Sequence, residues 1–248
     1  MSIHKGHRDR MKEKYLKVGI NCFVDHELLE VLLYYCYPRV DTNKIAHEML
    51  DEYKSLTALF QSDPEDIIRR TGVTKNVAVY ISLISQTAER FLQDKWKQEY
   101  KVIDSNKIAS DFLFALFLTK ANECFFMLLL DAKNNIIAAP LVQEGTIDRV
   151  HFYFRNVLEL IFKYRAVSVI LAHNHPSGNL RPSKEDILIT REFLKNLKII
   201  DVTLMDHIIV TGNQSYSFEA AGLLKALMEN ENTSEEDLLN VKSISDQL

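Results

Sequence analysis

The chain has 248 residues, of which 47% are hydrophobic and 26% charged, so it is large enough to bury one large core or two smaller ones. Its 30 Lys and Arg against 34 Asp and Glu give a formal charge of −4, which excludes a uniformly basic nucleic-acid-binding protein. Three widely spaced cysteines exclude a disulfide framework and an all-cysteine zinc site. No apolar run approaches the ~20 residues that cross a bilayer, and the N-terminus lacks the apolar segment of a signal peptide. We therefore expect a cytoplasmic protein with no membrane partner.

Residues 1–101 predict a helical module. Apolar residues recur at helical spacing, and Asp, Thr or Ser precedes several of these segments as a helix cap. The expected helices cover residues 25–33, 42–53, 64–70 and 76–91. The segment before them, residues 1–17, carries six Lys and Arg against two acidic side chains. This basic arm is the part of the module best suited to contact DNA phosphates.

Residues 102–228 predict an α/β domain. The apolar runs at 125–130 and 136–142, separated by Asp131-Ala-Lys-Asn-Asn, are typical of a β-hairpin. An expected helix, strand, helix and strand follow at 155–163, 167–172, 183–196 and 206–211. This alternation favours the α/β class. Residues 229–248 are acidic and polar, and we expect them to form a flexible tail.

One stretch of the second domain carries the clearest chemistry. His173 and His175 stand two positions apart where a buried strand ends, so their imidazoles point to the same side. A polar loop follows, and Ser183 opens the next helix with Asp186 in its first turn. Two imidazoles and a carboxylate, with a fourth position left for water, form the ligand set of a catalytic zinc site. Zinc makes such a water nucleophilic near neutral pH.

These residues also have a structural interpretation. A His-x-His pair alone is a weak signal. The segment from Ser183 to Asp186 also fits a capping box, in which the serine oxygen accepts from the first turn and the helix dipole favours the carboxylate. Capping and ligation by Asp186 are compatible. The combination of two histidines, a Pro-Ser-Gly turn and the carboxylate favours the metal site.

The pattern His173-x-His175 followed by Ser183-x-x-Asp186 resembles the JAMM motif of the MPN-plus, or JAB, metalloproteases. The longer string His-Asn-His-Pro-Ser-Gly, with Pro-Ser and Asp after it, is similar to the RadC family. The resemblance extends roughly over residues 5–228. It includes Gly145-Thr-Ile, Thr190, Asp206-His207-Ile-Ile, Arg8-Asp-Arg-Met and Asp25-His-Glu-Leu-Leu-Glu.

The resemblance implies a curved mixed β-sheet with flanking helices, similar to cytidine deaminases, behind a helix-hairpin-helix-like module. It implies one Zn²⁺ per chain held by His173, His175 and Asp186, with Ser183 helping to hold an oxyanion. The implied activity is that of a metallopeptidase, which cleaves an amide or isopeptide bond in a protein or peptide substrate. In such enzymes a glutamate takes a proton from the zinc-bound water.

Two glutamates are candidates for that base. Glu123 is the first choice, because its surroundings resemble the Glu that leads into an early strand of JAB domains; a solvated residue at a strand start is the alternative. Glu144 is the second, because Gly145 would let the backbone turn close to a metal, although a carboxylate at a hairpin edge looks the same. RadC proteins also resemble one another in a Pro-Arg-Glu where this chain has Asn156. Without that carboxylate, either the base lies elsewhere or the site is impaired.

Asp206 and His207 lie on a strand expected to pass near the metal. They are candidates for groups that orient a ligand from behind, because ligating imidazoles donate their other N–H to a carboxylate or carbonyl. The alternative is that both are satisfied structural residues.

The helical module leaves a second function open. Helix-hairpin-helix folds offer backbone N–H groups to a DNA phosphate, but Thr74 stands where a second hairpin glycine is expected. Arg8, Arg10 and Lys75 are the nucleic-acid-binding candidates, although residues 1–101 hold 16 basic and 15 acidic side chains. The alternative function is therefore a DNA repair or recombination accessory protein whose metal site is structural or vestigial.

A homodimer is one expectation for the oligomeric state. A zinc deaminase is disfavoured, because its Pro-Cys-x-x-Cys ligands have no counterpart here.

Overall fold

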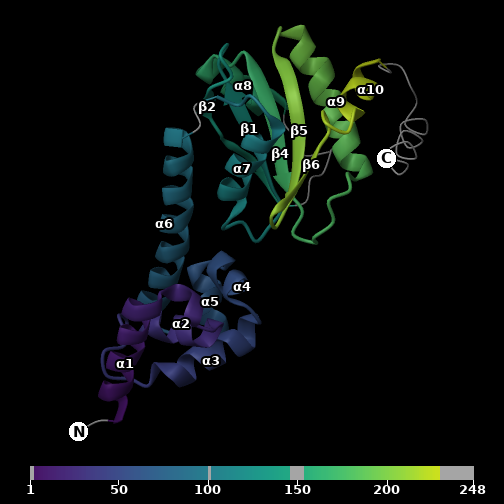
Figure 1. Cartoon of the computed structure of the whole chain (residues 1–248). Helices are drawn as coiled ribbons and strands as arrows, with labels where there is room; N and C mark the ends of the chain where they lie inside the picture. The colour runs from purple at the N-terminus through teal and green to yellow at the C-terminus, as the bar shows by residue number, and fades with distance from the viewer. Residues whose placement is uncertain (1–2, 100–101, 146–153, 230–248) are drawn as a thin grey trace. The chain divides into compact units, whose positions relative to one another are not determined.

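The computed structural model describes residues 3–99, 102–145 and 154–229 (Figure 1). The chain divides into two compact units, residues 1–90 and 91–248. This division falls inside a long helix, whereas the sequence places the boundary at residue 101, just beyond the end of that helix. The predicted tail lies outside the described residues from position 230 onward. Among the helices described, none combines the length and the apolar character needed to cross a membrane.

The N-terminal unit is helical, as predicted. Its elements are α1 (Ile3–Val18), η1 (Ile20–Cys22), α2 (Asp25–Leu33), α3 (Thr42–Tyr53), α4 (Leu56–Gln61), α5 (Pro64–Thr71) and the first part of α6 (Lys75–Glu99). The carboxylates of Asp41 and Asp63 accept hydrogen bonds from the first turns of α3 and α5, which explains where these helices begin. The segment predicted as a basic arm is instead the helix α1, which contacts α2.

The C-terminal unit is a mixed sheet with helices on both faces (Figure 1). Its elements are α7 (Asn106–Phe117), β1 (Cys124–Leu130), β2 (Ile136–Ala138), β3 (Leu141–Glu144), α8 (Phe154–Tyr164), β4 (Ser168–Asn174), α9 (Lys184–Ile199), β5 (Thr203–Thr211), β6 (Gln214–Ser217) and α10 (Leu223–Glu229). The strand order is β2-β1-β4-β5-β6, with β3 also paired to β1. Strands β4 and β5 are parallel, and the other pairs are antiparallel. The predicted α/β class with a mixed sheet is confirmed.

The second strand of the predicted hairpin is divided into two. Strand β2 ends at Ala138 and β3 begins at Leu141, and both pair with β1. Pro140 lies between them and has no N–H to donate, so it cannot continue the ladder. Its carbonyl still accepts from the backbone N–H of Met127 at 3.1 Å.

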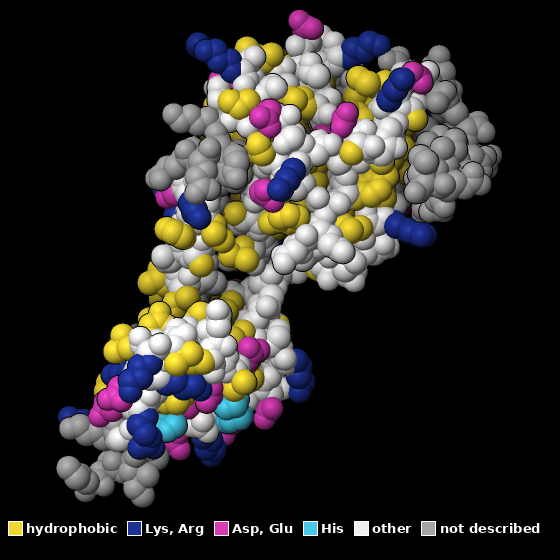
Figure 2. All heavy atoms as spheres, viewed as in Figure 1, with side chains coloured by type: hydrophobic (Ala, Val, Ile, Leu, Met, Phe, Trp, Pro, Cys, Tyr) yellow, Lys and Arg dark blue, Asp and Glu magenta, His cyan; other side chains and the backbone are white. Residues whose placement is uncertain are grey.

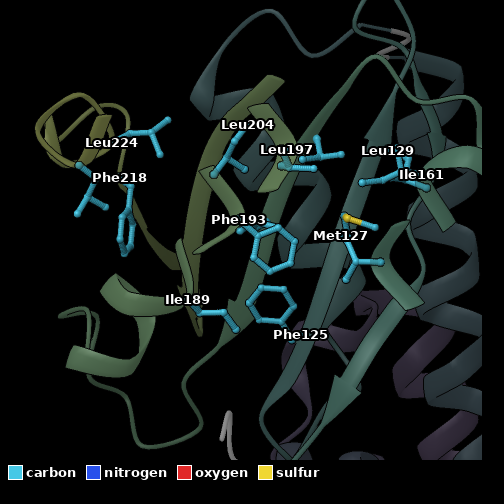
Figure 3. Close-up of a cluster of buried hydrophobic side chains, with 14 of the residues drawn as sticks. Phe125, Met127, Leu129, Ile161, Ile189, Phe193, Leu197, Leu204, Phe218 and Leu224 are labelled. Carbon is cyan, nitrogen blue, oxygen red and sulfur yellow. The ribbon is translucent and has the colours of Figure 1, made fainter. Parts of the chain in front are cut away.

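Strands β1 and β4 are buried along their whole length, which explains their nearly continuous apolar sequence. Helices α8, α9 and α10 cover one face of the sheet, where Phe193 of α9 lies against Phe125 of β1 (Figure 3). Helix α7 covers the other face. Side chains alternate along β4, so Leu171 faces α9 while Ala172 faces α7. This alternation directs His173 toward α9.

Candidate metal centre

His173 and His175 lie at the C-terminal end of β4 and face the same way, as predicted. The backbone N–H of His175 donates to the carbonyl of Val210 at 2.9 Å and so continues the ladder to β5. The Nε2 atoms of the two imidazoles are 2.9 Å apart. His173 is fully buried, whereas the His175 side chain is 14% exposed, so the site opens to solvent at His175.

Asp186 brings a carboxylate to this pair from the first turn of α9. Its Oδ1 lies 3.0 Å from Nε2 of His173, and its Oδ2 lies 3.5 Å from Nε2 of His175. The predicted capping box is also present: Oγ of Ser183 accepts from the Asp186 N–H at 3.0 Å, and Oδ2 of Asp186 accepts from the Ser183 N–H at 2.7 Å. The capping bonds therefore fix the carboxylate that faces the histidines.

The electrostatics of the site favour positive charge between these groups. Although burial raises it, the imidazoles of His173 and His175 beside the carboxylate hold the pKa of Asp186 well below its usual range. The hydrogen bond with Asp186 in turn raises the pKa of His175. A carboxylate that stays ionised while buried is suited to bind a cation.

Glu123 joins the site from the residue before β1. Glu123, His173 and His175 form a group whose potential ligand atoms lie within 4.8 Å of one another, and it is the single such group found in residues 3–99, 102–145 and 154–229. Phe125 pairs with His173 in the antiparallel β1·β4 ladder, which brings Glu123 to the end of β4 that carries the histidines. Burial raises the pKa of Glu123.

The other carboxylate candidates lie differently. Glu144 is exposed, and its Oε1 accepts from the side-chain amide of Asn122 at 3.2 Å. Asn156 is an exposed residue of α8. Of the two glutamates proposed as the base, the structure brings only Glu123 to the histidines within the described residues.

His207 lies behind His173, on β5. Its Nε2 is 2.9 Å from Nδ1 of His173, and its Nδ1 is 2.6 Å from the hydroxyl oxygen of Thr190 on α9. Thr190 donates to the backbone carbonyl of Asp186 at 2.5 Å. His207 and Thr190 are fully buried, and burial lowers the pKa of His207 well below its usual value. The geometry thus places His207 against His173, and its role in orienting a metal ligand stays a prediction.

Asp206 has structural contacts on the other face of the sheet. Its carboxylate accepts from the backbone N–H groups of His207 at 2.7 Å and Glu219 at 2.9 Å, and from the hydroxyl of Ser217 at 2.5 Å. These bonds join β5 to the end of β6 and the turn that follows. Burial raises the pKa of Asp206 to about 6.

Asn174 and Thr190 make contacts beside the site that the sequence motifs did not predict. Asn174, between the two histidines, accepts from the backbone N–H of Cys124 at 2.7 Å and donates to the carbonyl of Asn122 at 2.9 Å. Strand alternation could have indicated that the Asn174 side chain points to the opposite face of β4 from His173 and His175. The signal for Thr190 was its position four residues after Asp186, one helical turn away on the same face.

The donor set fits zinc. Two imidazole nitrogens and a carboxylate converge, a second carboxylate lies nearby, and one side is open to solvent. Nitrogen ligands combined with one or two carboxylates, with a position left for water, are typical of catalytic zinc centres. His173, His175 and Asp186 would hold such an ion.

The nucleic-acid candidates of the N-terminal unit differ in their surroundings. The Arg8 guanidinium donates to the carbonyls of Tyr37 at 2.6 Å and Val40 at 2.5 Å, and lies 4.6 Å from the ring centre of Tyr34. It therefore anchors α1 to α2 and the turn that follows. Arg10 and Lys75 are exposed. Figure 2 shows Lys and Arg interspersed with Asp and Glu on the visible face of this unit. DNA binding through Arg8, Arg10 and Lys75 stays a prediction.

The N-terminal helices followed by a mixed sheet with flanking helices are consistent with a JAB-like fold. A family model described as RadC-like JAB domain matches residues 103–223. The UPF0758 protein FN0909 of Fusobacterium nucleatum is 37% identical over 228 residues, which cover 89% of this chain and 98% of that protein. The UPF0758 protein PSHAa2643 of Pseudoalteromonas translucida is 31% identical over 87% of this chain and 96% of its own length. The UPF0758 protein BTH_I0781 of Burkholderia thailandensis is 33% identical over 87% of this chain and 82% of its own length. The chain belongs to the RadC family.

Proposed function

We propose that this protein is a zinc-dependent hydrolase of the metallopeptidase type, which cleaves an amide or isopeptide bond in a protein or peptide. The observation that carries this proposal is the convergence of Nε2 of His173, Nε2 of His175 and the Asp186 carboxylate at a solvent-accessible end of the sheet. When bound there, zinc lowers the pKa of a water molecule and polarises a carbonyl group.

Asp186 is the better ligand of the two nearby carboxylates. It is 1% exposed, and the Ser183 N–H and hydroxyl both donate to its Oδ2 at 2.7 Å. These bonds and its low pKa keep the carboxylate ionised and fixed toward His173, as a metal ligand requires.

Glu123 is the better proton acceptor. Its carboxylate lies within 4.8 Å of a ring nitrogen of each histidine, and burial raises its pKa, which suits a group that takes a proton from water near neutral pH. The same proximity makes direct ligation by Glu123 the competing role. Ligation and base catalysis differ in whether zinc remains bound when the charge of Glu123 is removed.

Ser183 is assigned a supporting role. Its hydroxyl donates its one proton to Asp186, so it holds the ligand in place. A contact with a substrate oxyanion requires that proton to be redirected away from Asp186. The proposed function therefore does not depend on Ser183 as an oxyanion donor.

The first test is the metal content of untagged protein, measured by mass spectrometry after reconstitution with zinc at neutral pH. We expect about one zinc per chain in the wild type, in Glu123→Gln and in the control Glu144→Gln, and none in His175→Ala. A wild type without zinc would overturn the proposal. Loss of zinc in Glu123→Gln alone would make Glu123 a ligand rather than the base.

The second test is turnover on a peptide library and on isopeptide-linked substrates. Wild type and Glu144→Gln should cleave the same substrate, whereas Glu123→Gln should retain zinc and lose at least ~100-fold in rate, the lower range for a general base. Equal turnover in His175→Ala would exclude hydrolysis by a zinc-bound water.

A further inference from the structure

We propose that the hydroxyl of Thr190 sets the tautomer of His173 through His207, so that the lone pair of His173 Nε2 faces the metal. This inference rests on the proposed zinc site and adds Thr190 as a positioning residue. The contacts form a continuous row from α9 through β5 to β4, entirely within the interior of the C-terminal unit.

The first step follows from the proton count at Thr190. Its hydroxyl has one proton, and it donates that proton to the carbonyl of Asp186 at 2.5 Å, because a carbonyl can only accept. The oxygen of Thr190 must therefore accept in its 2.6 Å contact with Nδ1 of His207. The proton of His207 accordingly resides on Nδ1.

The second step uses this proton position on His207 to assign the proton of His173, a proposed metal ligand. His207 is fully buried, and a neutral imidazole with its proton on Nδ1 presents a lone pair at Nε2. That lone pair accepts from Nδ1 of His173 at 2.9 Å. His173 therefore carries its proton on Nδ1. Its Nε2 has no proton and faces His175 and Asp186 with the lone pair that would bind the metal.

His175 reaches the same state by a separate route. Its Nδ1 is 2.5 Å from the carbonyl of Asn179, which can only accept, so Nδ1 carries a proton and Nε2 is the atom that faces the site. Nε2 of His175 lies 2.9 Å from Nε2 of His173 and 3.5 Å from Oδ2 of Asp186, so a proton or a metal ion between these atoms would hold the three groups together. The partners of the two Nδ1 atoms thus direct both Nε2 atoms toward the proposed metal position.

The row also ties two ligands together. Asp186 supplies its carboxylate to the metal centre and its carbonyl to Thr190, one helical turn further along α9. His173 is therefore oriented by the same helix turn that carries Asp186. A shift of α9 would change the position of one ligand and the protonation order of the other.

Thr190→Val removes the hydroxyl with little change in shape. It leaves Nδ1–H of His207 without an acceptor in a buried position, which favours the tautomer with the proton on Nε2. His207 then donates to Nδ1 of His173, and the proton of His173 moves to the metal-facing Nε2. We expect zinc affinity to fall about 10- to 100-fold, the range for groups that hold a ligating histidine.

The experiment combines imidazole ¹⁵N NMR of the metal-free protein with zinc affinity from competition against a chromophoric chelator. Wild type and Thr190→Ser, which retains the hydroxyl, should show the Nδ1–H tautomer at His173 and His207 and bind zinc within about threefold of each other, well under the 10-fold loss expected of a disrupted relay. Thr190→Val should show the Nε2–H tautomer at both. The proton on Nδ1 of His175, which contacts the carbonyl of Asn179, should remain in all three proteins, as an internal control.

The outcomes separate this inference from the proposed function. A folded Thr190→Val protein that keeps the wild-type tautomers and zinc affinity would overturn the relay and leave the zinc site intact. If Thr190→Val does not fold, the wild-type spectrum decides, since a proton on Nε2 of His173 also overturns the relay. A wild type with the expected tautomers but no zinc binding would overturn the proposed function and support the hydrogen-bond order alone.

Discussion

Asn174 holds Glu123 in place from the opposite face of the sheet. Its side-chain amide accepts from the backbone N–H of Cys124 at 2.7 Å and donates to the carbonyl of Asn122 at 2.9 Å, so both neighbours of Glu123 are bound to it. Asn174 itself lies between the two histidines in sequence. One residue therefore sets the distance between the proposed base and the proposed ligands.

Asn174→Ala should lower catalysis more than zinc content. The change leaves the buried N–H of Cys124 unpaired, at about 1–3 kcal/mol, and releases the segment that carries Glu123. A displacement near 1 Å can lower the rate on the order of 100-fold. Single-turnover rates and metal content check this, with Asn196→Ala as control, because that amide binds the backbone of its own helix. Equal rates in both variants would remove the positioning role.

Asp206 should make the stability of the protein depend on pH. Its pKa rises from 3.8 to about 6 on folding because it is buried. Between these values the folded state binds the extra proton, so the free energy of unfolding falls as pH rises from about 4 to about 6. One pKa unit corresponds to about 1.4 kcal/mol, which gives an effect on the order of 2–3 kcal/mol.

The measurement is urea unfolding of the metal-free wild type and Asp206→Asn between pH 4 and pH 7.5. Asparagine retains the oxygen that accepts from His207 and Glu219, but it has no titration. The variant should gain stability relative to wild type as pH rises, and the difference should level off above about pH 7. A difference in the free energy of unfolding that is constant across this range would show that the pKa of Asp206 does not change on folding.

The convergence of His173, His175 and Asp186 could be predicted from the sequence because its signals are local. Strand alternation placed His173 and His175 on one side, and the capping box placed Asp186 in the first turn of α9. The contacts of His207 were not predictable to the same degree. They depend on the parallel register in which His207 lies beside Leu171, and on a helix 17 residues away in the sequence.

Two helices show why parts of the fold escaped the sequence. Helix α1 was interpreted as a basic arm, because its charges mask the contacts of His7, Arg8 and Lys14 with α2 and the turn after it. Helix α7 has buried residues around most of its surface, so the one-sided apolar period that identifies a surface helix is absent. Both depend on contacts between elements rather than on local pattern.

Arg8→Lys should destabilise the N-terminal unit. Both carbonyls, of Tyr37 and Val40, accept from the same guanidinium nitrogen, Nη2, and lysine keeps the charge but loses the planar group that holds this nitrogen in place over the Tyr34 ring. Because Arg8 is half-buried, we expect a loss of about 1 kcal/mol, below the value for a fully buried charged hydrogen bond. Chemical unfolding measures it, and the exposed Arg10→Lys is the control. If Arg8→Lys unfolds as the wild type does, the contacts of Arg8 do not stabilise the unit, and its predicted role in binding DNA remains.

Phe193 should connect core packing to the metal centre. It is fully buried on α9, with its ring centre 6.1 Å from that of Phe125 (Figure 3). The Phe125 ring in turn stacks on His173, with 5.9 Å between the ring centres. Phe193→Ala leaves a cavity behind Phe125 and should cost about 3–5 kcal/mol, whereas Phe193→Leu should cost less because it fills more of the space. Loss of support for His173 should also lower zinc affinity in Phe193→Ala.

Urea unfolding with and without zinc tests both effects. The control is Phe162→Ala, whose side chain is 63% exposed and should shift stability by under about 0.5 kcal/mol. If Phe193→Ala loses stability but binds zinc as tightly as Phe162→Ala, the packing of Phe125 does not support His173.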